Sequence, residues 1–134
     1  MTIVVGTDTS AAADLAVADA AQLAAARGTE LLLLYVQPEG ETHSAVDPNR
    51  AADPARHLGR LASRYPGLTT RTRLESGDPA ERIVAVAEQE GADTIVVGNR
   101  GAQGSWWRVR DSVPNLVLRH APCSVLIVDT RKAQ

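Results

Sequence analysis

Five short segments along the chain have the residue pattern of strands in a parallel sheet. Four of them are mainly continuous runs of valine, isoleucine and leucine, as expected of strands that are covered on both faces. The third segment instead alternates threonine and arginine, which predicts an edge strand with one solvated face. The expected strands are Thr2 to Thr7, Glu30 to Gln37, Thr69 to Leu74, Thr94 to Gly98 and Ser124 to Asp129.

Helix signals lie between these strands. Ser10 and Asp53 are suitable N-cap residues, and Asp78-Pro79-Ala80-Glu81 has the form of a capping box with proline at the first helical position. The first helix is rich in alanine and is expected to pack on the sheet through Ala12, Leu15, Ala16, Ala20 and Leu23. The predicted helices run from Ser10 to Arg27, from Asp53 to Tyr65, from Asp78 to Gly91, and through Val113, Leu116 and Val117.

The alternation of strands and helices predicts an α/β fold. With 134 residues the chain is long enough for one continuous core and too short for two. We therefore expect a single domain over residues 1–134, built as an open parallel five-stranded sheet with helices on both faces. Right-handed crossovers lead to a Rossmann-like arrangement with the strand order 3-2-1-4-5.

A ligand crevice is expected beyond the carboxyl ends of the strands, where the winding direction of such a sheet reverses. Two segments with suitable chemistry follow the first and fourth strands: Thr7-Asp8-Thr9-Ser10 and the stretch from Gly98 to Ser112. Residues 38–52 carry proline, glycine and acidic residues without an apolar period, which predicts a long loop within the domain.

Charge and cysteine content restrict the expected binding partners and the expected cellular compartment of the protein. The formal net charge of -2 provides no domain-wide positive field for nucleic acid or an anionic membrane. The apolar runs are too short to span a bilayer, and no basic leader precedes the first strand. The single cysteine, Cys123, is expected to be a structural thiol and allows no intrachain disulfide. We expect a cytoplasmic protein that binds neither nucleic acid nor membrane.

Neither metal binding nor catalysis has a clear signal. The three histidines, His43, His57 and His120, lack metal-ligand spacing, and His120 is better explained as a favourable contact at a helix C-terminus. No nucleophile elbow is present, and no residues form a nucleophile, base and orienting group. We assign no catalytic residue and no metal site, and favour binding over enzymatic activity.

Four segments together resemble the universal stress protein family across nearly the whole chain. The first is Ile3-Val4-Val5-Gly6-Thr7-Asp8-Thr9-Ser10, which is similar to the family's opening strand and Asp-Gly-Ser turn, with Thr9 in place of the glycine. Gly77-Asp78-Pro79-Ala80 resembles its helix start. The segments from Gly91 to Gly101 and from Val117 to Val128 resemble its fourth strand with the first glycine turn, and its closing helix and strand.

The resemblance implies an adenine-nucleotide site. ATP-binding members carry glycine, two residues, glycine, nine residues, glycine, and then serine or threonine. Gly98, Gly101 and Ser112 match this signature, whereas Asp111 stands at the position of its last glycine. By the resemblance Asp8 faces the adenosine part, Val36 offers its backbone to the base, and the cofactor is ATP or AMP, with Mg²⁺ if ATP. The implied binding residues are Thr7, Asp8, Val36, Gly98, Arg100, Gly101, Asp111, Ser112 and Val113.

Asp111 changes what this site can bind. Its carboxylate can accept the helix N-terminal N–H groups that a phosphate would need, so the chain would supply its own anion. Repulsion of an incoming phosphate would cost about 1 to 4 kcal/mol, which is roughly a tenfold to several-hundredfold loss of affinity. Three neighbouring arginines, Arg100, Arg108 and Arg110, could compensate for that charge.

Three functional hypotheses remain from the sequence. The leading one is a stress-response regulatory protein with weakened phosphate binding, which acts on a protein partner with or without an adenine nucleotide. The alternative is a genuine ATP or AMP sensor, with slow ATP hydrolysis as a further option. The third is a structural interaction module, suggested by Trp106 and Trp107, which either form a binding surface or pack as a lid. Asp8 likewise either lines the crevice or only caps the following helix.

The last predicted strand also suggests self-association. Ser124 to Asp129 is apolar, yet the strand order places it at a sheet edge, and such an edge needs covering. Isologous pairing with a second copy is the simplest way to cover it, and members of the resembled family commonly pair in this way. We therefore expect a homodimer.

Overall fold

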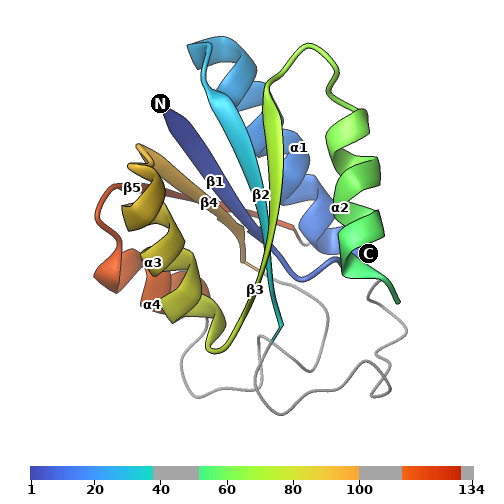
Figure 1. Cartoon of the computed structure of the whole chain (residues 1–134). Helices are drawn as coiled ribbons and strands as arrows, with labels where there is room; N and C mark the ends of the chain where they lie inside the picture. Colours follow the sequence, from blue (N-terminus) through green and yellow to red (C-terminus); the bar gives the residue numbers. More distant parts are fainter. Residues whose placement is uncertain (38–51, 100–112, 131–134) are drawn as a thin grey trace.

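The computed structural model describes residues 1–37, 52–99 and 113–130 of the chain. Helices and strands alternate through these residues, and the helices lie on both faces of one sheet (Figure 1). The strands are β1 (Thr2–Thr7), β2 (Glu30–Gln37), β3 (Thr70–Ser76), β4 (Thr94–Gly98) and β5 (Ser124–Val128). The helices are α1 (Ala11–Arg27), α2 (Pro54–Ser63), α3 (Pro79–Glu90) and α4 (Val113–His120).

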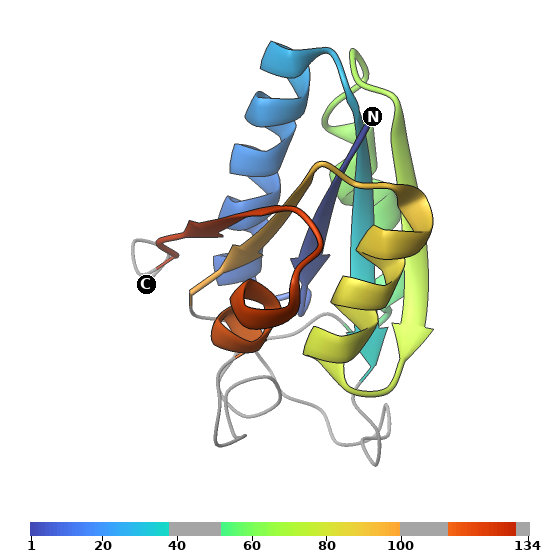
Figure 2. The ribbon, with the colours of Figure 1, turned by 90° about the vertical axis from the view of Figure 1, so that its left-hand side faces the viewer.

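The sheet has the predicted architecture. Its strand order is β3-β2-β1-β4-β5, and every neighbouring pair is parallel. Buried residues of α1 and α2 pack on one face of the sheet, and those of α3 and α4 on the other. Figure 2 shows α3 and α4 in front of the sheet and α1 behind it. The predicted fold class and strand order are confirmed.

Local signals located the helix starts correctly. Ser10, Asp53 and Asp78 are the N-cap residues of the first three helices, and each side chain accepts a backbone N–H from the first helical turn. Gly28 and Gly91 end α1 and α3 in the left-handed conformation. These contacts involve neighbours in the sequence, so they can be identified without knowing the fold.

The predicted packing face of α1 is partly wrong. Ala16 and Ala20 are buried as expected, and Leu23 is partly buried against the same core, but Ala12 and Leu15 lie at the half-buried margin of the helix. The buried stripe instead consists of Ala13, Ala16, Val17, Ala20, Ala21 and Ala24. In a helix so rich in alanine the apolar period is weak, so the side chains that face the sheet are hard to distinguish from their neighbours.

Several element ends also differ from expectation. β3 begins at Thr70 and continues two residues beyond Leu74, because Glu75 and Ser76 pair with Val36 and Gln37 of β2. β5 ends at residue 128 rather than at residue 129. α2 ends at residue 63, two residues before the predicted end. A polar residue can take part in ladder pairing through its backbone, which a side-chain pattern does not reveal.

The edge strand β3 is solvated as predicted, and charged side chains cover its α3 side. Arg71 forms ion pairs with Glu30 of β2 and Glu90 of α3. On the same strand, Arg73 Nε lies 2.7 Å from Glu75 Oε2, and Arg82 of α3 reaches the other oxygen of that carboxylate at 2.8 Å. Such side chains protect an edge strand from pairing with another chain.

Candidate functional site

The sheet opens between the carboxyl ends of β1 and β4. Pairing between β1 and β4 ends at Val5 and Val96, although β1 continues to Thr7 and β4 to Gly98. On its other side, β1 stays paired with β2 as far as Thr7 and Tyr35. The winding direction of the sheet reverses between β1 and β4, and ligands of open α/β sheets bind at this point.

The turn from β1 to α1 lies at this opening and is held by its own side chains. The Thr9 N–H donates to Thr7 Oγ1 at 3.0 Å, and the Ser10 N–H donates to Asp8 Oδ1 at 3.0 Å. Ser10 Oγ in turn accepts the Ala13 N–H at 3.0 Å. Three backbone N–H groups near the N-terminus of α1 are therefore bonded within the turn and are not available to a phosphate.

Asp8 is almost completely buried, with 1% of its surface exposed. It is not the cap of α1, because Ser10 has that role and Asp8 accepts the N–H of Ser10 itself. The hypothesis that Asp8 only caps the helix is therefore wrong. Hydrogen bonds to a carboxylate shielded in this way are strong, because water competes for it little.

The end of β4 is tied to the end of β5 by Asn99. The side-chain oxygen of Asn99 accepts the Thr130 backbone N–H at 3.0 Å and the Thr130 hydroxyl at 3.3 Å. The backbone N–H of Asn99 donates to the Val128 carbonyl at 2.9 Å. Asn99 thus fixes the backbone immediately after Gly98, next to the opening between β1 and β4. The sequence analysis did not single out Asn99, although its position between the two glycines of the signature was a usable signal.

The structure places five of the nine predicted site residues. Thr7, Asp8, Val36 and Gly98 lie at the carboxyl ends of β1, β2 and β4, which form one edge of the sheet. Val113 is buried at the start of α4. The other predicted site residues, Arg100, Gly101, Asp111 and Ser112, lie outside the described residues. So do Trp106, Trp107, Arg108, Arg110 and all of the predicted loop except residue 52.

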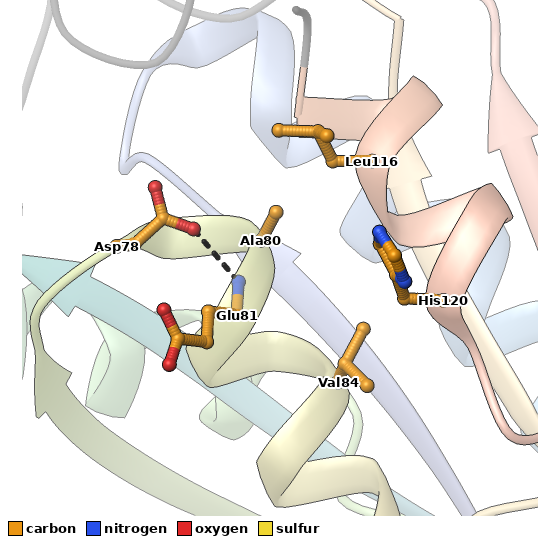
Figure 3. A pocket seen from close by; sticks show the side chains of 6 residues that line it. All are labelled: Asp78, Ala80, Glu81, Val84, Leu116 and His120. Atoms are coloured by element: carbon orange, nitrogen blue, oxygen red, sulfur yellow. Dashed lines mark hydrogen bonds between the residues drawn. The ribbon is translucent and has the colours of Figure 1, made fainter.

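A groove lies between α3 and α4. It has a volume of about 350 Å³ and is lined by Asp78, Ala80, Glu81, Val84, Leu116 and His120. In Figure 3, Ala80, Val84, Leu116 and His120 face one another, whereas the carboxylates of Asp78 and Glu81 lie along the α3 side. None of the predicted site residues lines this groove. A phosphate would meet two carboxylates along its α3 side, so the groove is a poor phosphate site.

One hydrogen bond between α1 and α2 was missed by the sequence analysis. His57 Nε2 of α2 lies 3.0 Å from Asp14 Oδ1 in the first turn of α1, and both side chains are largely buried. The two residues are 43 positions apart, and no local pattern connects them. The pair fastens the start of α2 to the start of α1.

The described parts of the chain hold no cluster of metal-ligating side chains, and Cys123 is only partly accessible. There, no three His, Cys, Asp or Glu side chains lie close enough to hold a metal ion. Cys123 is half-buried, and burial raises the pKa of its thiol, with a further increase from the nearby Asp93 carboxylate. None of the helices there has the length and apolar content needed to cross a membrane.

Comparison with known proteins places this architecture in one family. The model of the universal stress protein family matches residues 1–129. A universal stress protein of Mycobacterium tuberculosis is 33% identical over 96% of this chain and 96% of its own length. A relative from Mycolicibacterium smegmatis is 29% identical over 96% of this chain, which spans only 46% of that longer protein.

Solved structures agree with the sequence comparisons. A universal stress protein in complex with cAMP has a TM-score of 0.75 and 30% identity, with 97% of each chain covered. The universal stress protein from Archaeoglobus fulgidus in complex with dAMP has a TM-score of 0.71 and 25% identity, and the match covers 95% of this chain and 96% of that chain. From its sequence, strand order and structural relatives, this chain belongs to the universal stress protein family.

Proposed function

We propose that this protein is a stress-response regulator that binds an adenine nucleotide in the opening between β1 and β4. The observation that carries the proposal is the early end of β1–β4 pairing, with the buried Asp8 beside it. Family relatives in complex with cAMP and dAMP support the same ligand class. We further propose that the signal passes to a protein partner.

The turn after β1 is suited to the nucleoside part of such a ligand rather than to its phosphates. Two of its N–H groups are bonded to Thr7 and Asp8, the Ala13 N–H of α1 is bonded to Ser10, and Asp8 adds a carboxylate. A carboxylate accepts hydrogen bonds from hydroxyl or amino groups and repels phosphate oxygens. We therefore place the nucleoside beside Asp8 and the phosphate on the β4 side.

In the family signature a glycine stands where this chain has Asp111, and we propose that the aspartate charge limits how much phosphate charge the protein accepts. Each additional phosphate would add negative charge at the position where the family signature has glycine and this chain has aspartate. We propose that ligands with one phosphate, such as cAMP and AMP, bind more tightly than ATP. Electrostatic repulsion of about 1 to 4 kcal/mol acts against the triphosphate.

Calorimetric titration of cAMP, AMP and ATP into the purified protein tests this proposal. We expect cAMP and AMP to bind, and ATP to bind roughly tenfold to several-hundredfold more weakly. The variant Asp111→Gly should regain ATP affinity by a similar factor and change cAMP affinity less. Asp19→Gly, an exposed aspartate in α1, is the matched control and should bind all three ligands like wild type.

The titrations distinguish the competing hypotheses. Tight ATP binding by wild type, unchanged in Asp111→Gly, would mean that Asp111 does not weaken phosphate binding and would favour the ATP-sensor alternative. No binding of any of the three nucleotides to wild type would refute the nucleotide proposal altogether.

We also propose that the protein is a homodimer paired through β5. This strand is an edge of the described sheet, where β4 is its partner. Leu126 and Ile127 on it are 40% and 37% exposed, on opposite faces of the strand. An apolar edge strand of this kind is stabilised by pairing with a second copy.

A further inference from the structure

Thr9 has an unusual backbone conformation for its residue type. Its φ is 67°, and it is the one non-glycine residue with positive φ among the described residues. A β-branched residue in the left-handed region is a genuine outlier, because its Cβ crowds the neighbouring carbonyl. Thr9 is also buried, so the surrounding structure must hold it in this conformation. Strained residues of this kind occur preferentially at functional sites.

The contacts of Thr9 hold the residue before it. The Thr9 hydroxyl donates to the backbone carbonyl of Asp8 at 2.6 Å. The Thr9 N–H donates to Thr7 Oγ1 at 3.0 Å, and the next N–H, that of Ser10, donates to Asp8 Oδ1 at 3.0 Å. Asp8 is therefore fixed through both its carbonyl oxygen and its carboxylate.

Glycine would be the unstrained choice at this position, since it adopts positive φ freely. It would also lose the hydroxyl that bonds to the Asp8 carbonyl, and it would let the turn reach other conformations. Thr9 thus has a strained backbone, but its hydrogen bonds restrict Asp8 to one orientation. A group held in this way has less entropy to lose when a ligand binds.

We propose that Thr9 is a positioning residue, which fixes Asp8 at the opening between β1 and β4 for the nucleoside part of the ligand. This inference rests on the proposed function and adds to it a determinant of affinity that does not itself contact the ligand. It also assigns the role to one side-chain group, the hydroxyl that bonds to the Asp8 carbonyl.

The test compares wild type with Thr9→Gly and Thr9→Ser. Affinity for cAMP is measured by calorimetry, and exchange of the Ser10 amide hydrogen is measured by NMR. Thr9→Gly should weaken cAMP binding roughly tenfold, the size expected when a hydrogen-bonded charged group loses its fixed orientation, and should speed exchange of the Ser10 amide. Thr9→Ser keeps the hydroxyl and should bind within about twofold of wild type. Urea titration checks that each variant remains folded at the temperature of the binding experiment.

The outcomes separate the inference from the proposed function. If wild type and Thr9→Gly bind cAMP equally, Thr9 is not a positioning residue, and the nucleotide proposal still stands. If Thr9→Ser loses as much affinity as Thr9→Gly, the hydroxyl is not the group responsible, and the inference is wrong. If wild type does not bind cAMP, AMP or ATP, the proposed function fails and the inference fails with it.

Discussion

Gly6 illustrates how closely the elements approach one another at the scale of single residues. It lies near the carboxyl end of β1, under α3, and a Cβ built on it would be 2.7 Å from Ile83 Cδ1. Ile83 is fully buried, so its side chain has little room to move aside. The glycine is therefore required by packing and not by its own backbone conformation. Its position one residue before Thr7 links this packing to the candidate site.

Replacing Gly6 by alanine should destabilise the protein by about 1 to 3 kcal/mol, because the added methyl group overpacks the core. Urea unfolding monitored by circular dichroism measures the change. The variant Ile83→Val, which lacks Cδ1, should by itself cost about 0.5 to 1.5 kcal/mol. Since it removes the clashing atom, the double variant should be more stable than the sum of the two losses predicts. Strict additivity would mean that this contact does not determine the effect.

At the scale of elements, an ion-pair network joins β2, β3 and α3. Hydrogen bonds from Arg71 lower the pKa of Glu30, and a hydrogen bond from Arg73 lowers the pKa of Glu75. Both carboxylates lie on the α3 side of the sheet and are only about a quarter exposed. Each group is therefore held ionised in the folded protein more strongly than in the unfolded chain.

This network predicts that the protein becomes less stable in acid. As the pH falls below 4.5, the ordinary value for glutamate, the unfolded chain takes up protons that the folded protein does not. The stabilisation is present above that pH and is lost as the pH falls towards the lowered pKa of the folded state. Urea unfolding from about pH 3 to about pH 7, on both sides of the glutamate pKa, should show a shallower loss of stability for Glu75→Gln than for wild type.

A matched control for that experiment is Glu88→Gln. Glu88 lies on the exposed face of α3 and has no ion pair within the described residues. This variant should follow the acid profile of wild type. If Glu75→Gln and Glu88→Gln gave identical profiles, the ion pairs around Glu75 would not be the source of the acid sensitivity.

At the scale of the whole molecule, the two edges of the sheet differ in how they are protected. The β3 edge carries arginines in ion pairs, whereas the β5 edge exposes Leu126 and Ile127. Charged edges discourage pairing between chains and apolar edges favour it. We propose that the β5 edge is the one that pairs with a second copy, and this edge is also joined to the candidate site through Asn99 and Thr130.

The dimer proposal predicts that Leu126→Lys shifts the protein from dimer to monomer. The added charge would have to be buried between the two copies, which is unfavourable without a partner. Light scattering coupled to gel filtration measures the mass. Leu74→Lys is the matched control, because Leu74 is 51% exposed on the opposite edge strand and should leave the dimer intact. A wild-type protein that elutes as a monomer would contradict the proposal.

The sequence predicted those features that depend on neighbouring residues. The N-caps at Ser10, Asp53 and Asp78 and the buried strands follow from local rules, and the strand order follows from their alternation with helices. The pair Asp14–His57 could not be predicted, since its two residues meet only after α1 and α2 have packed. The packing face of α1 was partly misjudged because alanine gives a weak apolar period.

The candidate site was only partly predictable, for similar reasons. The positions of Thr7, Asp8 and Gly98 at strand ends follow from the fold class, so they were identified correctly as neighbours of one sheet edge. The positive φ of Thr9 was not expected, because threonine rarely adopts it. The family's glycine at this position was the available signal. The closure of the turn by its own hydrogen bonds could be recognised only in the folded structure.

We propose that an adenine nucleotide binds at the opening between β1 and β4. Hydrogen exchange, followed by mass spectrometry with and without saturating cAMP, tests it most directly, because it locates the ligand without any mutation. We predict slower exchange in the turn from Thr7 to Ser10 and at Gly98 and Asn99, where the two strands separate. Protection confined to the α3–α4 groove, or no protection at the turn, would contradict the claim.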